Sequence, residues 1–264
     1  MKDKLVKMIE ASHKYNSEHM AFQSLGLSED TVYDAIVIAP SFSPYKLHMD
    51  EYCEVTTLKE GSYVAGYSVK KDGLNIAWVK TASSAGNIID YMTLCAELSF
   101  KRLIFIGAVG ALKEGFDVGD ICTPSYSVSG SMADVYLQNE SFREGKLFSK
   151  VMPNVAYVDQ IIGLGREKGY DIRKASVFCT PSLTLEYIHL DEIRSFDTDL
   201  IEMETSAFYY MTDLFELPGI ALLVVSDNSA SGVPLVGRSE DEERKYDYGR
   251  HVVIPDMILS MAAL

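Results

Sequence analysis

Three short, uncharged runs of apolar residues constrain the fold more than any other feature of the chain. They cover residues 35–39, 103–106 and 221–225, and proline, glycine or small polar residues follow each run. A run this short and uniformly apolar is typical of a strand that is buried on both faces of a sheet. Segments with apolar residues at helical spacing alternate with these runs. The alternation predicts a mainly parallel sheet covered by helices, an α/β fold.

Other local patterns predict the elements around these strands. Apolar side chains recur at helical spacing over residues 2–22, so residues 1–22 are expected to form a helical extension before one domain, residues 23–264. The dipeptide Asp72-Gly73 predicts a tight turn between two strands within residues 61–81.

Three further helices are expected. They are predicted over residues 87–100, 204–215 and 239–261. The third of them is expected to be interrupted near Pro255, because proline removes a helical hydrogen bond and clashes with the preceding turn.

The composition excludes several classes of function. The 264 residues carry a formal net charge of −14 and form no Lys/Arg cluster, which argues against a nucleic-acid partner. No apolar run is long enough to span a membrane, and the start of the chain does not resemble a signal sequence. No pattern has metal-ligand spacing, so neither a metal nor a cofactor is expected. Widely separated cysteines favour reduced thiols in the cytoplasm; they are Cys53, Cys95, Cys122 and Cys179.

The ends of the predicted strands carry the candidate site residues. Ligands of open α/β sheets bind at the carboxyl ends of the strands. Small or polar groups stand at three such ends, and they are Ser83 with Ser84, Gly107-Ala108-Val109-Gly110, and Ser226-Asp227. The glycines allow backbone N–H groups to approach an anion or a sugar, although a simple tight connection explains them equally well.

Two carboxylate motifs have a functional and a structural interpretation each. In Glu202-Met203-Glu204, one carboxylate is expected to face solvent, while the other faces inward and accepts hydrogen bonds from adjacent hydroxyls. The alternative is an acidic first turn that complements the helix dipole. Asp227 follows a buried strand, so burial would raise its pKa and allow it to act as a general acid. Its alternative role is that of a turn cap.

Taken together, these motifs resemble the nucleoside phosphorylase and nucleosidase superfamily, which includes purine nucleoside and uridine phosphorylases. The similarity runs from about Leu25 to the C-terminus. Beyond the motifs above, residues 105–112 are similar to the glycine-rich strand end of the family, and Val118-Gly119-Asp120 is similar to the turn that follows it. The resemblance implies a single domain with a central mixed sheet and helices on both faces.

The resemblance also implies roles for individual residues. Glu204 would bind the ribose 2′- and 3′-hydroxyls, Met203 would pack against the sugar, and Asp227 would protonate N7 of a purine as the bond breaks. The residues implied near the base are Phe178, Leu183, Ile201 and Asn228.

The phosphate site departs from the phosphorylase pattern. Tyr45, Cys53 and Phe105 stand where phosphate-binding arginines would be expected, and Ala108 replaces a hydroxyl residue. Without those cations a phosphate dianion loses charge-assisted hydrogen bonds. The phosphate or water site is expected at Ser83, Ser84, Gly107 and Ala108, and Lys46 is the nearby cation that could compensate.

Hydrolysis of a purine nucleoside or nucleotide is therefore slightly preferred to phosphorolysis. The alternatives are a phosphate-dependent purine or uridine phosphorylase, and a nucleoside-binding protein that lacks activity. Glu204 and Asp227 favour an enzyme, because a pure binder needs no general acid. The resemblance further implies a homo-oligomer, a dimer or a hexamer, with shared active sites.

Overall fold

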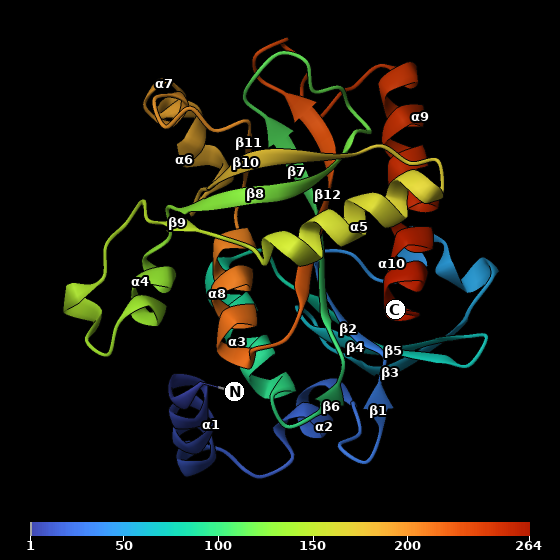
Figure 1. Cartoon of the computed structure of the whole chain (residues 1–264), viewed down its shortest axis with the longest axis vertical. Helices are drawn as coiled ribbons and strands as arrows, with labels where there is room; N and C mark the ends of the chain where they lie inside the picture. Colours follow the sequence, from blue (N-terminus) through green and yellow to red (C-terminus); the bar gives the residue numbers. More distant parts are fainter. Residues whose placement is uncertain (1) are drawn as a thin grey trace.

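The three apolar runs form neighbouring parallel strands at the centre of one sheet. They correspond to β2 (Ala35–Pro40), β7 (Leu103–Ala111) and β12 (Gly219–Asn228), in the order β2-β7-β12. The computed structural model describes residues 2–264. Figure 1 shows these strands with helices around them, so the predicted α/β fold is confirmed.

The uniformly apolar sequence of these strands has a direct structural cause. Along β7, Leu103 and Phe105 point into one apolar core, whereas Ile104 and Ile106 point into another. Both faces of the strand are thus removed from water, and neither face tolerates a charge. The helices of the structure are α1 (Asp3–Tyr15), α2 (Met20–Leu25), α3 (Ala85–Cys95), α4 (Met132–Gln138), α5 (Val155–Glu167), α6 (Leu183–Ile188), α7 (Leu190–Arg194), α8 (Thr205–Phe215), α9 (Glu240–Tyr248) and α10 (Ile254–Ala262).

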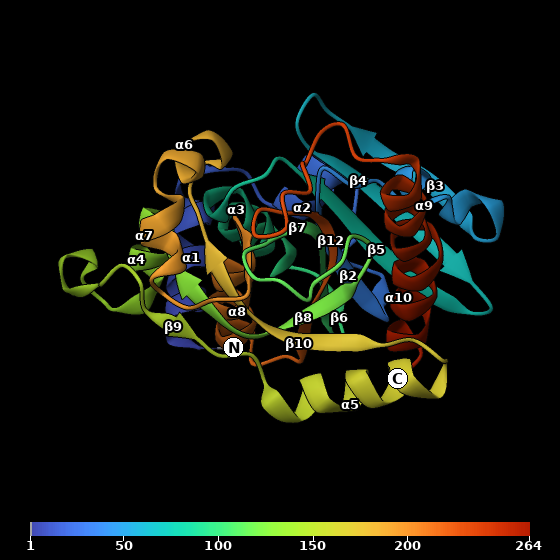
Figure 2. The ribbon, with the colours of Figure 1, turned by 90° about the horizontal axis from the view of Figure 1, so that it is seen from above.

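Helices cover the two faces of the sheet. Residues of α1, α2, α3 and α8 pack into the first core, and residues of α5, α9 and α10 pack into the second. Figure 2 shows α5 and α10 on one side of the strands and α3 on the other. The remaining strands are β1 (Val32–Tyr33), β3 (Glu54–Glu60), β4 (Ala65–Lys71), β5 (Leu74–Thr81), β6 (Ser99–Phe100), β8 (Ile121–Ser129), β9 (Lys150–Val151), β10 (Ile172–Cys179) and β11 (Leu200–Glu202).

The main sheet is mixed and partly closed. Its order is β11-β10-β8-β12-β7-β2-β5-β4-β3, with β9 paired to β8. It contains parallel pairs such as β12–β7 and β10–β8 and antiparallel pairs such as β12–β8. Because β11 also pairs with β7, five of these strands form a closed circuit. The expected mixed sheet is confirmed, and the closure brings distant strand ends together.

Two predicted helices differ from those in the structure. The expected helix over residues 2–22 is two helices, α1 and α2, separated by a segment in which His19 has φ 62°. The helix expected over residues 87–100 begins at Ala85, because the Ser84 side chain accepts a hydrogen bond from the Asn87 backbone N–H, and it ends at Cys95. The predicted hairpin at Asp72-Gly73 is present between β4 and β5.

The C-terminal helix is interrupted before Pro255 and not by it. A π-helical turn over Gly249–Val253 joins α9 to α10, and Pro255 lies in the first turn of α10. Val253, the residue before α10, is itself helical, so the backbone stays helical from α9 through the π-helical turn into α10. The interruption near Pro255 is therefore a change of helix type, located at the turn directly before the proline.

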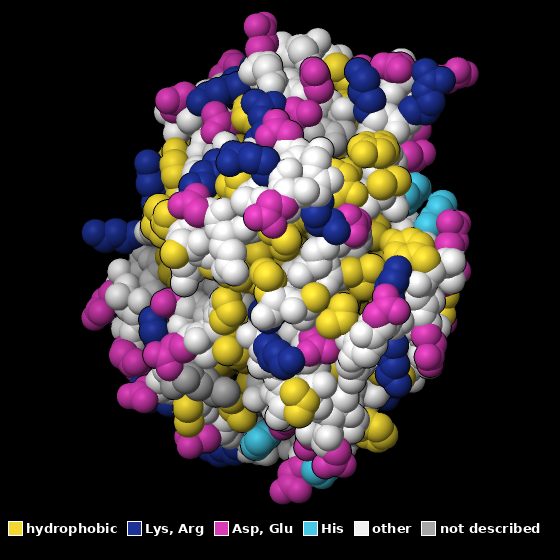
Figure 3. Space-filling view, turned by 45° about the vertical axis from the view of Figure 1, so that its right-hand side comes forward, with side chains coloured by type: hydrophobic (Ala, Val, Ile, Leu, Met, Phe, Trp, Pro, Cys, Tyr) yellow, Lys and Arg dark blue, Asp and Glu magenta, His cyan; other side chains and the backbone are white. Residues whose placement is uncertain are grey.

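The surface carries charges of both signs. Figure 3 shows Lys and Arg side chains interspersed with Asp and Glu on the face drawn there. Over residues 2–264, no helix has the combination of length and apolar character that a membrane span requires. In the same part of the chain, no three His, Cys, Asp or Glu side chains are grouped so that they could hold a metal ion.

Candidate active site

A pocket of about 280 Å³, which we call the central pocket, lies where several strand ends meet. Its walls come from segments that follow β2 and β5, from the ends of β7, β11 and β12, and from the segment that follows β10. All three expected strand ends contribute to its lining, through Ser83, through residues 107–110, and through Ser226 with Asp227. Parallel pairing of β2, β5, β7 and β12 places their carboxyl ends at one edge of the sheet.

A bulge in β12 orients Asp227. The register between β12 and β7 shifts between Val225 and Asp227, which places Asp227 opposite Gly110. A Cβ on Gly110 would lie 3.0 Å from Asp227 Oδ2, so the glycine permits the close approach of the carboxylate. Ser226 Oγ donates a 2.6 Å hydrogen bond to Asp227 Oδ1. Burial raises the pKa of Asp227, and the Ser226 hydrogen bond opposes this.

Glu202 caps the helix that follows it. Its carboxylate accepts hydrogen bonds from the backbone N–H of Glu204 at 2.7 Å and of Thr205 at 2.9 Å, and from the Thr205 hydroxyl at 2.8 Å. These are groups at the start of α8 that have no intrahelical partner. The structural interpretation of an acidic first turn therefore applies to Glu202.

In Glu204, by contrast, only one carboxylate oxygen has no protein partner, since the side chain also has a hydrogen bond to the Met203 backbone. Its Oε1 is buried and accepts no hydrogen bond from residues 2–264, although the side chain lines the central pocket. Burial, and then the negative charge of Glu202, raise the pKa of Glu204. The expectation that one carboxylate of the pair faces solvent is wrong, since both residues are only 6% exposed. A buried oxygen without a donor is costly unless a ligand supplies one.

The residues expected near the base divide between the pocket and its surroundings. Leu183, Ile201 and Met203 line the central pocket. Phe178 does not; its ring packs against those of Phe148 and Phe196. Asn228 is also absent from the lining.

The side chain of Asn228 is used to hold a loop. Its Nδ2 donates to the carbonyls of Lys113 and Phe116, at 3.0 and 2.8 Å, and its Oδ1 accepts from the N–H groups of Ala230 and Ser231. All its polar atoms are therefore engaged away from the pocket.

Of the five residues expected at the phosphate or water site, three line the pocket. Ser83, Gly107 and Ala108 line it, whereas Ser84 caps α3. Lys46 lies outside the lining, and its Nζ donates to the carbonyl of Ser41 at 3.1 Å.

Ser41 and Glu186 were missed by sequence reasoning. Ser41 lines the pocket with φ 64°, and its Oγ lies 3.4 Å from that of Ser83. Glu186, on α6, also lines the pocket, and burial followed by the charge of Asp227 raises its pKa to about 7. An isolated glutamate in a short helix has no sequence signal that separates it from a surface residue.

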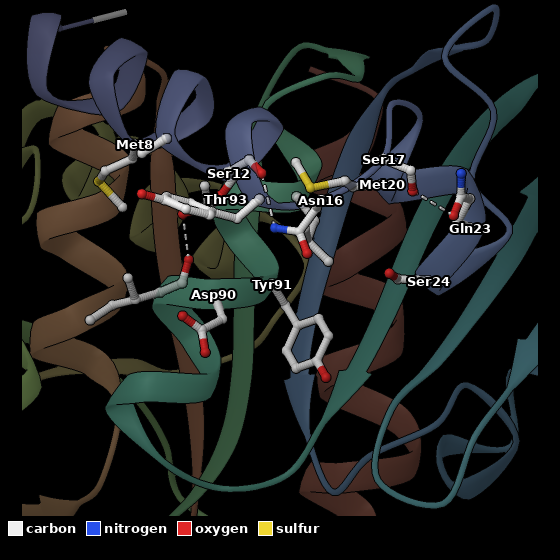
Figure 4. A pocket seen from close by; sticks show the side chains of 14 residues that line it. Met8, Ser12, Asn16, Ser17, Met20, Gln23, Ser24, Asp90, Tyr91 and Thr93 are labelled. Atoms are coloured by element: carbon white, nitrogen blue, oxygen red, sulfur yellow. Dashed lines mark hydrogen bonds between the residues drawn. The ribbon is translucent and has the colours of Figure 1, made fainter.

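A larger hollow of about 710 Å³ lies between α1, α2 and α3, away from these strand ends. Figure 4 shows Met8, Met20 and Tyr91 among the side chains around it. It contains none of the buried side-chain oxygens or nitrogens that lack a partner. The central pocket is smaller, but it is the better candidate because the unpartnered Oε1 of Glu204 belongs to its lining.

The comparison with protein families agrees with this geometry. Residues 48–247 match the family model of the phosphorylase superfamily, which is more than half of the chain. The chain belongs to the phosphorylase superfamily. The family recognised from the sequence motifs, and the enzyme class that it implied, are thereby confirmed.

Individual members of the superfamily are distant in sequence and close in fold. The chain is 22% identical over 210 residues to the DeoD-type purine nucleoside phosphorylase of Anoxybacillus flavithermus. The aligned residues cover 79% of this chain and 87% of that protein. It is 26% identical over 188 residues to the DeoD-type enzyme of Alkaliphilus metalliredigens, covering 68% and 74%. Uridine phosphorylase from Vibrio fischeri ES114 has a similar structure, with a TM-score of 0.71, 16% identity, and coverage of 90% and 94%.

Proposed function

We propose that the chain cleaves the N-glycosidic bond of a purine nucleoside or nucleotide in the central pocket. The observation that carries this proposal is the unpartnered, buried Oε1 of Glu204, which shares the pocket with Asp227. Two adjacent ribose hydroxyls would supply the donors that Glu204 lacks. A protonated Asp227 would donate to N7 as the base leaves, and its raised pKa keeps that proton available closer to neutral pH.

These contacts suit the transition state of glycosidic cleavage. The sugar develops positive charge and the base develops negative charge as the C–N bond breaks. A carboxylate at the sugar and a proton donor at the base both interact more strongly with this state than with the intact nucleoside. Only such differential interactions raise the rate of the chemical step.

Phosphate is the acceptor that we propose. The relatives above are named as phosphorylases, and this favours phosphate over the water preferred from the sequence alone. The dianion would lie at the end of the pocket formed by Ser41, Ser83 and Gly107-Ala108. Lys46 donates to the carbonyl of Ser41, a residue of the lining, and is a cation close to these residues.

One observation keeps hydrolysis as a second candidate. Among the described residues that line the pocket, none is lysine, arginine or histidine. Tyr45 donates to the Val55 carbonyl, and Phe105 is buried in the first core, so neither position supplies a cation. A phosphate dianion in a pocket with several carboxylates needs a counter-charge from outside the lining. Lys46 is one source, Arg238, which donates to the Ser226 carbonyl at 2.9 Å, is another, and a second subunit is a third.

The test is release of free base from adenosine, inosine, methylthioadenosine and AMP, with and without phosphate. Phosphorolysis requires phosphate and yields ribose 1-phosphate or its 5-substituted equivalent. Release of free sugar at the same rate in the absence of phosphate establishes hydrolysis instead. If no base is released but the nucleosides bind, the chain is a binding protein. Adenosine should also be cleaved much faster than its 2′,3′-dideoxy analogue, which cannot donate to Glu204.

A further inference from the structure

A second pocket, also of about 280 Å³, lies next to the central pocket and shares two residues with it. Thr180 and Glu186 line both. We call it the aromatic pocket, because the rings of Phe148, Phe178 and Phe196 form its wall. None of these three rings lines the central pocket, and none has a role in the proposed reaction.

The three rings form one packed cluster. The centroids of Phe148 and Phe196 lie 4.9 Å apart, those of Phe178 and Phe196 lie 5.1 Å apart, and those of Phe148 and Phe178 lie 6.1 Å apart. Leu185 and Ile193 add aliphatic surface to the same pocket. Such a wall binds apolar or aromatic groups through area burial and ring stacking.

Phe148 is held in a costly position in this cluster. Its φ of 63° lies in the left-handed region, which is unfavourable for a bulky side chain, and 48% of the residue is exposed. Its backbone N–H is fixed by a 2.6 Å hydrogen bond to the Ser129 carbonyl. Strained residues of this kind cluster at ligand sites, where the local cost is offset by the contacts that they prepare.

Three carboxylates, those of Glu204, Asp227 and Glu186, relate the aromatic pocket to a purine bound in the central pocket. Under the proposed function, Glu204 marks the sugar and Asp227 marks N7. Glu186 lines the central pocket together with Asp227 and also lines the aromatic pocket. N7 and the substituent on C6 lie on the same edge of a purine. A group on C6 therefore points past Glu186, and the aromatic pocket begins there.

We propose that the aromatic pocket receives an apolar substituent carried by the C6 amino group of the purine. This inference rests on the proposed function and names the class of base: an N6-alkyl or N6-arylmethyl adenine. A singly substituted amino group keeps one N–H, which can donate to Glu186. Phe178, which sequence reasoning assigned to the base itself, contacts the substituent instead.

Binding of free bases tests the proposal without relying on catalysis. Calorimetry should show that N6-benzyladenine binds at least about 10-fold more tightly than adenine, which is the low end of what filling an apolar pocket contributes. Phe148→Ala and Leu185→Trp should reduce this preference to about 3-fold or less, the first by removing a wall and the second by filling the space. Phe142→Ala is the matched control, because Phe142 is 51% exposed and stacks on Tyr136 outside the pocket. It should leave the preference intact.

The kinetic comparison uses N6-benzyladenosine and adenosine. The parent protein should cleave both, and Leu185→Trp should lose the benzyl substrate selectively, by about 10-fold in kcat/KM. Equal binding of the two bases, or exclusion of N6-benzyladenine because a second copy of the chain covers the pocket, would overturn the proposal. Failure to cleave any purine nucleoside contradicts the proposed function instead, and the calorimetric result then still decides this inference.

Discussion

At the scale of single residues, the proposed chemistry depends on carboxylates whose surroundings differ. Glu202 is saturated with donors, Glu204 lacks one, and Asp227 has one serine hydroxyl. A pattern of acidic residues in the sequence does not reveal such differences. They arise from which backbone N–H groups the fold directs toward each side chain.

Replacing Asp227 with asparagine should lower the rate of base release from adenosine about 10²–10⁴-fold, the usual contribution of general acid catalysis. The amide is nearly isosteric, so the fold should persist. The control substrate is a p-nitrophenyl riboside, whose p-nitrophenolate leaving group departs without protonation. Both proteins should cleave it almost equally. Equal loss of both substrates would mean that Asp227 only organises the pocket.

Glu186 should make stability depend on pH. Its pKa of about 7 in the folded protein lies above the usual value, so the native state binds the proton more tightly than the unfolded state. The contribution of Glu186 to the free energy of unfolding therefore falls as pH rises from about 4.5 to 7, and it stays lower above that range. Glu186→Gln should raise Tm by a few degrees at pH 8 and leave it unchanged at pH 4.

The control for this experiment is Glu114→Gln, at an exposed position. It should have the same Tm as the parent at both pH values. A Glu186→Gln protein that is less stable at pH 8 would show that the ionised carboxylate makes a favourable contact.

At the scale of elements, the close packing of α2 on β4 makes one glycine irreplaceable. A Cβ at Gly66 would lie 1.8 Å from the carbonyl oxygen of Leu25, which is backbone and cannot rotate away. Gly66→Ala should therefore destabilise the protein by at least about 1–3 kcal/mol. Gly163 lies in α5, and a Cβ added there would have no atom within 4 Å. Gly163→Ala should stabilise by about 0.5–1 kcal/mol.

Urea unfolding of the two variants measures this difference directly. The midpoint should fall for Gly66→Ala and rise for Gly163→Ala. If both variants unfold at the same urea concentration as the parent, the end of α2 is free to move away from β4.

At the scale of the whole molecule, assembly would allow a second subunit to supply a cation to the central pocket. Its lining lacks a cation among the described residues, and the family resemblance implies active sites shared between subunits. We expect a homo-oligomer with a mass that is a multiple of 29.3 kDa. Sedimentation equilibrium at micromolar concentration is the measurement, and a monomer at these concentrations would contradict the expectation.

The sequence by itself determined the central strands and most of the central pocket. Uniformly apolar runs predicted β2, β7 and β12, since a strand buried on both faces cannot carry a charge. The order of the elements then placed Asp227 and the glycines of β7 at one edge. Strands with buried polar residues gave weaker patterns, and β8, which contains Thr123, Pro124 and Ser127, was not predicted.

Only the tertiary structure decided which side chains complete the site. The closure of the sheet by β11 on β7 brings Glu204 to Asp227, and the placement of α6 adds Glu186. These contacts join residues far apart in the chain, and no local periodicity encodes them. The same packing places Phe178 in the wall of the aromatic pocket and outside the lining of the central pocket. Local patterns set which residues are buried, whereas long-range strand pairing sets which buried groups meet.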